Sequence, residues 1–107
     1  MPHYLLQASY SPEACARMVE NPQDRGEVVR HVIEKLGGKM IAAFYALGEH
    51  DTVAFVELPD NNSATAFSLA AASGGGLLGL KTTPLLTMAE GIEAMKKAAT
   101  VGYKPPA

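Results

Sequence analysis

The pair His50-Asp51 is the best candidate for chemistry in this sequence, because two ionisable residues are adjacent within the turn-forming run Gly48-Glu49-His50-Asp51. Histidine titrates near neutral pH, so His50 could act as a general acid or base while the carboxylate of Asp51 orients its ring. The alternative is a purely structural turn. Aspartate at a turn commonly accepts backbone N–H groups, and neighbouring side chains at a strand end point in opposite directions.

A second group of residues could line a ligand-binding pocket between the sheet and a partner subunit. Glu57 lies in an apolar run typical of a central strand, where an ionised carboxylate needs a partner such as Lys81 or a polar cavity. A strand-end position half exposed to solvent is the other interpretation. Alternation along residues 3–10 places His3 and Gln7 on one face. The predicted ligand-binding residues are Gln7, Tyr45, Glu57, Lys81 and Thr83.

The remaining reactive groups favour simpler interpretations. The single cysteine, Cys15, excludes an intrachain disulfide, and its place on an apolar helical stripe predicts an inert thiol. His3, His31 and His50 show no short ligand spacing, so we predict no metal site, and no cofactor is implied. Amine catalysis by Pro2 would require removal of Met1.

Charge and hydropathy exclude two classes of partner. Nine basic and eleven acidic residues give a net charge of −2, and no basic run is long enough to indicate a nucleic-acid surface. The longest stretch without charge, residues 61–80, is interrupted by polar residues and three consecutive glycines, which argues against a membrane span. Because the N-terminus lacks the basic and apolar regions of a signal peptide, we expect a cytoplasmic protein.

The spacing of apolar residues, together with helix-capping and helix-breaking residues, predicts the helices and strands that carry these side chains. Ser11-Pro12-Glu13 is a typical helix start, and Asn21-Pro22 should break or kink the helix that follows. Pro84 within the last strand indicates a sheet edge or a bulge. Thr87 and Glu90 have capping-box spacing. The predicted order is a strand over 3–10, a helix from 12 to 36, strands over 39–47 and 52–58, a helix over 64–73, a strand over 77–86, and a helix to about residue 100.

This order predicts one α+β domain spanning residues 1–107, with a ferredoxin-like βαββαβ arrangement plus a C-terminal helix. Both crossover helices should cover the same face of a four-stranded antiparallel sheet. The runs 39–47 and 52–58 carry large apolar residues on both faces, so the uncovered face would expose a patch that monomers rarely tolerate. The charge-free helix over 64–73 also favours burial against another chain. We therefore expect a homo-oligomer.

The turn and its surroundings resemble the GYD-domain family, whose name-giving motif is Gly-x-Tyr-Asp. The resemblance covers nearly the whole chain, and His50 stands where the motif has tyrosine. It implies a ferredoxin-like fold in dimeric α+β-barrel style, and it implies no particular activity. The segments that carry it are Leu36-Gly37-Gly38-Lys39, Gly48-Glu49-His50-Asp51, the run from Val53 to Glu57-Leu58-Pro59-Asp60, and Lys81-Thr82-Thr83-Pro84-Leu85.

Two function classes follow from these features. The first is a small oligomeric module that binds a small organic molecule in a sheet-face cavity or serves in assembly. The second is a cofactor-free enzyme acting on small organic compounds, with His50 as acid or base. A cavity with His3 or His50 pointing inward would favour the enzyme, and a filled barrel with both outside would favour the module.

Overall fold

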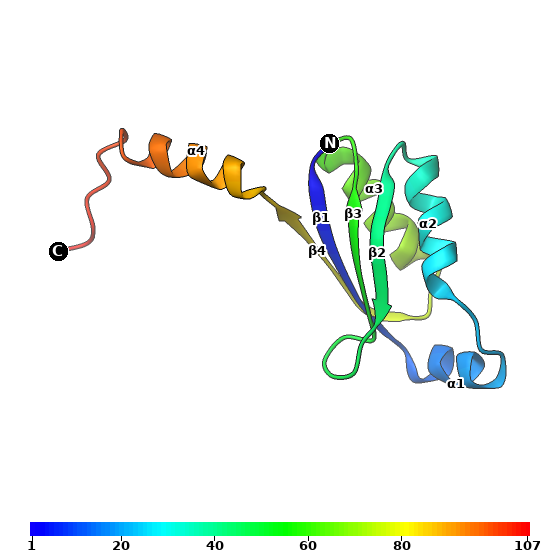
Figure 1. Cartoon of the computed structure of the whole chain (residues 1–107). Helices are drawn as coiled ribbons and strands as arrows, with labels where there is room; N and C mark the ends of the chain where they lie inside the picture. The colour runs from blue at the N-terminus through cyan, green and yellow to red at the C-terminus, as the bar shows by residue number, and fades with distance from the viewer.

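The computed structural model describes all residues from 1 to 107 and is built on a four-stranded antiparallel sheet (Figure 1). The strand order is β2-β3-β1-β4, which is compatible with a ferredoxin-like arrangement. None of the helices combines the length and apolar composition needed to cross a membrane. The elements are β1 (His3–Tyr10), α1 (Pro12–Glu20), α2 (Arg25–Lys35), β2 (Lys39–Tyr45), β3 (Thr52–Glu57), α3 (Asn61–Ser73), β4 (Leu77–Leu85) and α4 (Met88–Ala98).

Capping side chains fix where the first three helices begin. The Ser11 hydroxyl accepts the Ala14 N–H at the start of α1, and the Asp24 carboxylate accepts the Glu27 N–H at the start of α2. The predicted break at Asn21-Pro22 is confirmed, because it separates these two helices. Asp60 caps α3 through the Ser63 N–H, so α3 begins at Asn61 rather than at Ala64 as predicted.

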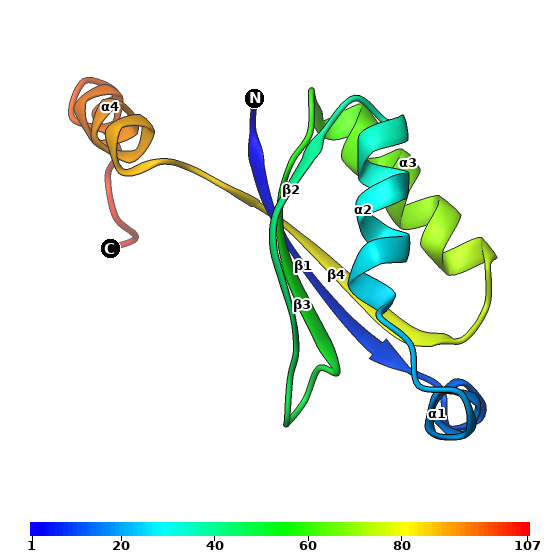
Figure 2. The same ribbon diagram turned by 45° about the vertical axis from the view of Figure 1, so that its right-hand side comes forward.

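Strand parity separates the two faces of the sheet. Tyr4 and Leu6 of β1 are buried under the helices, whereas Leu5 between them points to the other face and is half-buried. Figure 2 shows α2 and α3 on one side of the sheet. We call this side the helix face and the opposite side the bare face.

The core lies between the helix face and helices α2 and α3. Tyr4 is almost fully buried, and its hydroxyl donates to Asn61 Oδ1 at 2.7 Å, which links β1 to the start of α3. Gly38 allows α2 to end close to β3, because a Cβ there would lie 2.2 Å from the Glu57 carbonyl oxygen. The buried core residues are Tyr4, Leu6, Ile33, Ala54, Val56, Leu58, Ala64 and Phe67.

The C-terminal part departs from a compact shape. β4 is an edge strand bonded only to β1, which confirms the edge position predicted from Pro84. The predicted capping box is also confirmed, since Thr87 Oγ1 accepts the Glu90 N–H while Glu90 Oε1 accepts the Thr87 N–H. The helix α4 extends away from the body and buries no residue (Figure 2). The radius of gyration is accordingly 17.1 Å, against about 13 Å for a compact chain of this length.

Candidate functional site

The bare face is built from three cross-strand rows, each running from β2 through β3 and β1 to β4. Their pairing follows directly from the strand register. Phe44 and Phe55 are 63% and 40% exposed, so large apolar surface remains open to water here. The rows are Phe44, Val53, Gln7 and Lys81; Ala42, Phe55, Leu5 and Thr83; and Lys39, Glu57, His3 and Leu85.

Glu57 has a partner, but it differs from the predicted one. Its Oε1 lies 3.5 Å from His3 Nε2, the residue directly opposite on β1, and both side chains are partly buried. The predicted contact with Lys81 is wrong, because Lys81 pairs with Gln7 two rows of the sheet away. The carboxylate therefore lies at one margin of the bare face, beside the partly buried imidazole of His3.

The turn holding His50 and Asp51 docks on the other end of β1. Asp51 Oδ2 accepts the Tyr10 N–H at 2.7 Å, and the Asp51 backbone bonds Ala8 and Ala46, each at 2.8 Å. His50 Nδ1 lies 3.4 Å from the Ser9 hydroxyl, which also reaches the Glu49 carbonyl oxygen at 3.1 Å. The Asp51 carboxylate thus serves the backbone of β1, as the structural interpretation of the turn expects.

Tyr45 is separated from the other four predicted ligand-binding residues. Gln7, Glu57, Lys81 and Thr83 belong to the rows of the bare face, whereas Tyr45 pairs with Thr52 and reaches the helix side. Its hydroxyl donates to the Gln23 carbonyl oxygen at 2.6 Å and accepts the Arg25 N–H at 3.1 Å. The expectation that all five residues share one surface is therefore wrong.

A β-bulge explains the position of Tyr45. Met40 pairs with Val56 on the helix face, and strict alternation from Met40 would send Tyr45 to the bare face. The register shifts between Met40 and Ala42, because the extra residue Ile41 is inserted there. Every later side chain of β2 is consequently inverted.

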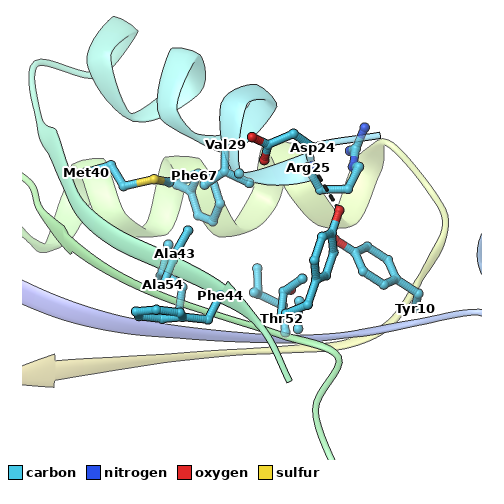
Figure 3. A pocket seen from close by; sticks show the side chains of 15 residues that line it. Tyr10, Asp24, Arg25, Val29, Met40, Ala43, Phe44, Thr52, Ala54 and Phe67 are labelled. Atoms are coloured by element: carbon cyan, nitrogen blue, oxygen red, sulfur yellow. Dashed lines mark hydrogen bonds between the residues drawn. The ribbon is translucent and has the colours of Figure 1, made fainter. Parts of the chain in front are cut away.

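Two adjoining hollows lie on the helix face. The smaller has a volume of about 100 Å³ and lies between the sheet and the first turns of α2, where Met40 and Phe67 approach each other (Figure 3). The larger has a volume of about 650 Å³ and is bounded by α1, α2 and α3. Both are mainly apolar, and they share Ala8, Tyr10, Arg25, Val29, Thr52, Phe67 and Leu80.

Sequence reasoning did not identify these hollows as a site. Tyr10, Arg25 and Thr52 are the polar residues that line both hollows, while Val29 and Phe67 belong to apolar patterns that indicate only a core. The available signal was the break at Pro22, which prevents α1 and α2 from forming one straight helix and leaves space beside them.

The remaining reactive groups lie apart from one another. His3 contacts Glu57, His50 contacts Ser9, and His31 is exposed on α2. No three His, Cys, Asp or Glu side chains come close enough to hold a metal ion together. Cys15 is a free, half-buried thiol on α1.

Comparisons with known proteins add one assignment. The family model described as GYD domain matches residues 4–95, which run from the first residues of β1 into α4. The search of curated proteins finds no match to the chain. The match includes both faces of the sheet and the turn that carries His50 and Asp51.

Proposed function

The chain belongs to the GYD domain family, and from this premise we propose that it is a self-associating binding module. In this proposal the bare face packs against a second copy in the manner of a dimeric α+β barrel. The helix face keeps its hollow for a small organic molecule. The observation that carries the proposal is the difference between the two faces of the sheet. The bare face is apolar and exposed, whereas the helix face is covered by helices and contains a hollow.

Self-association is supported by the residues at the centre of the bare face. Phe44 and Phe55 are exposed on adjacent strands, and Leu5 and Val53 extend the same apolar surface. Burial of such surface is favourable in proportion to the apolar area removed from water. A second copy offers the same surface, and a two-fold arrangement pairs it with itself.

Small-molecule binding is supported by the size and lining of the larger hollow. A volume of about 650 Å³ falls within the usual range of ligand sites, roughly 300 to 1,000 Å³. Its walls are mainly apolar side chains of α2 and α3, with Arg17, Arg25 and Glu20 among the charged residues. Because opposite charges are both present, the lining favours a small apolar molecule with a polar end over a strongly charged one.

The ligand proposal is tested by filling the hollow. We expect a panel of small aromatic and aliphatic compounds to contain members that raise the melting temperature. The variant Ala70→Leu adds volume inside the hollow and should abolish that shift. Ala72→Leu makes the same change at an exposed position of α3 that does not line it, and should retain the shift. Equal shifts in both variants would remove the hollow as the site.

The association proposal is tested by the mass in solution. Size-exclusion chromatography with light scattering should give at least twice the chain mass of 11.3 kDa at micromolar concentration. A stable monomer under these conditions would contradict it. In the proposed dimer, the polar residues Gln7, Lys81 and Thr83 would face the partner subunit. Their role in holding a ligand at the interface stays a prediction.

Cofactor-free catalysis with His50 as acid or base is the second candidate. The observation favouring it is the contact between His50 Nδ1 and the Ser9 hydroxyl at 3.4 Å, which puts an imidazole beside the bare face. If a compound bound at the bare face is converted, His50→Ala should abolish the conversion and preserve binding. Unchanged turnover in that variant would exclude His50.

A further inference from the structure

The helix α4 carries an apolar stripe that its own chain leaves uncovered. Met88, Ile92 and Met95 follow one another at spacings of four and three residues, so they lie on one side of the helix. They are 89%, 51% and 71% exposed. An isolated helix of this length is marginal in water, and its stability normally comes from packing of such a stripe. The stripe therefore requires a partner surface.

The position of α4 indicates where that surface lies. α2 and α3 cover the helix face, whereas α4 projects on the opposite side of the sheet, beyond the end of β4 (Figure 2). Only Leu86 and Thr87 connect β4 to α4, and Thr87 is held in the capping box. The arm is thus presented toward whatever packs on the bare face.

We propose that α4 is an exchanged arm, whose stripe Met88–Ile92–Met95 packs on a second copy of this chain. This inference rests on the proposed association through the bare face and adds a second contact to it. A two-fold arrangement places each arm beside the partner subunit, so the contact is made twice. No flexible linker is needed for this contact, because the two-residue connection between β4 and α4 already sets the direction of the helix.

The charges of α4 favour a protein partner over a lipid surface. Its polar side carries Glu90 in the first turn, Glu93 in the middle, and Lys96 and Lys97 in the last turn, so the two signs balance. A helix that binds anionic membranes has an excess of basic residues on its polar side. The order of the charges instead complements the helix dipole and keeps the exposed side of a docked arm hydrated.

The test compares two added carboxylates on the same helix. Ile92→Glu places one on the stripe, and Ala94→Glu places one on the other side of α4, where it should remain in water. By sedimentation equilibrium, Ile92→Glu should weaken dimerisation by about tenfold or more, since a charge would be buried at an apolar contact. Ala94→Glu should stay within about twofold of the parent chain. Because α4 has no buried residue, neither change should unfold the sheet.

Hydrogen exchange gives an independent readout of docking. In the parent dimer the amides of residues 92–98 should exchange more slowly than in a Phe55→Glu variant that is monomeric. Equal exchange, or equal dissociation constants for the two carboxylate variants, would overturn the exchanged arm while leaving the bare-face association in place. A monomeric parent chain would overturn both. A failure of the arm is therefore distinguishable from a failure of the proposed function.

Discussion

Truncation of Phe55 to alanine is the sharpest test of the bare face as an interface. Phe55 occupies the middle row of that face, and 40% of it is exposed in the single chain. Its other side already packs in the sheet. Removal of the ring should therefore weaken association far more than it disturbs the fold of one subunit.

The expected magnitude follows from the exposed area. A phenylalanine side chain offers about 200 Å², so the exposed fraction of 40% corresponds to about 80 Å². At about 25 cal/mol per Å², burying this area contributes about 2 kcal/mol per subunit. A two-fold dimer loses it twice, which is about 4 kcal/mol, or a factor near 1,000 in the dissociation constant. Imperfect packing at the interface reduces this loss of binding free energy, so we expect the dissociation constant to increase between about 100-fold and about 1,000-fold.

The assay is sedimentation equilibrium over a range of concentrations, with circular dichroism to check the fold. Val19→Ala is the matched control, because Val19 is 81% exposed on α1 and belongs to neither the bare face nor α4. Its dissociation constant should equal that of the parent chain. If Phe55→Ala dimerises as tightly as Val19→Ala, the bare face is not the interface and the area argument is refuted.

Three further predictions concern stability, each measured by urea unfolding. Gly38→Ala should lower the free energy of unfolding by about 3 kcal/mol or prevent folding, because its Cβ would meet the Glu57 carbonyl oxygen at 2.2 Å. The control Gly79→Ala, where nothing lies within 4 Å, should change the free energy of unfolding by less than about 0.5 kcal/mol. A similar cost in both variants would contradict this explanation. Asp51→Ala should cost about 1 to 3 kcal/mol by removing the acceptor of the Tyr10 N–H, and a cost near zero would show that the turn does not hold β1. Burial, and to a smaller extent the charge of Asp60, raises the pKa of Tyr4 above its ordinary 10.0, so the folded chain holds the phenol proton more tightly than the unfolded chain. The resulting contribution to the free energy of unfolding is complete below pH 10.0 and falls as pH rises through the folded pKa. This pH dependence should be absent in Tyr4→Phe.

The local signals in the sequence predicted most of the fold. Caps and breakers are short-range features, so Ser11, Pro22 and the Thr87–Glu90 pair marked helix starts and a break correctly. Pro84 also marked an edge strand, because a residue without an N–H is tolerated where one side of the strand is unpaired. Alternation along β1 identified the two faces of the sheet.

The candidate site was less predictable, because it depends on register between distant segments. The bulge at Ile41 has no signature in the run 39–47, yet it decides on which face Tyr45 lies. The partner of Glu57 depends on the pairing of β1 with β3, which aligns it with His3 rather than with Lys81. The larger hollow is lined by residues of α1, α2 and α3, and the break at Pro22 indicates only that α1 and α2 are separate helices, not how they are placed relative to α3.

The single inserted residue in β2 makes the length of that strand more constraining than its composition. Deleting any one position between Met40 and Phe44 would exchange the orientations of two successive aromatic rings, turning Phe44 inward and Tyr45 outward. The deletion would remove both the Tyr45 hydrogen bonds at the start of α2 and the Phe44 ring from the apolar surface of the bare face. Conservative replacements at the same positions would leave both intact, so tolerance to substitution and intolerance to shortening should coexist within one short strand.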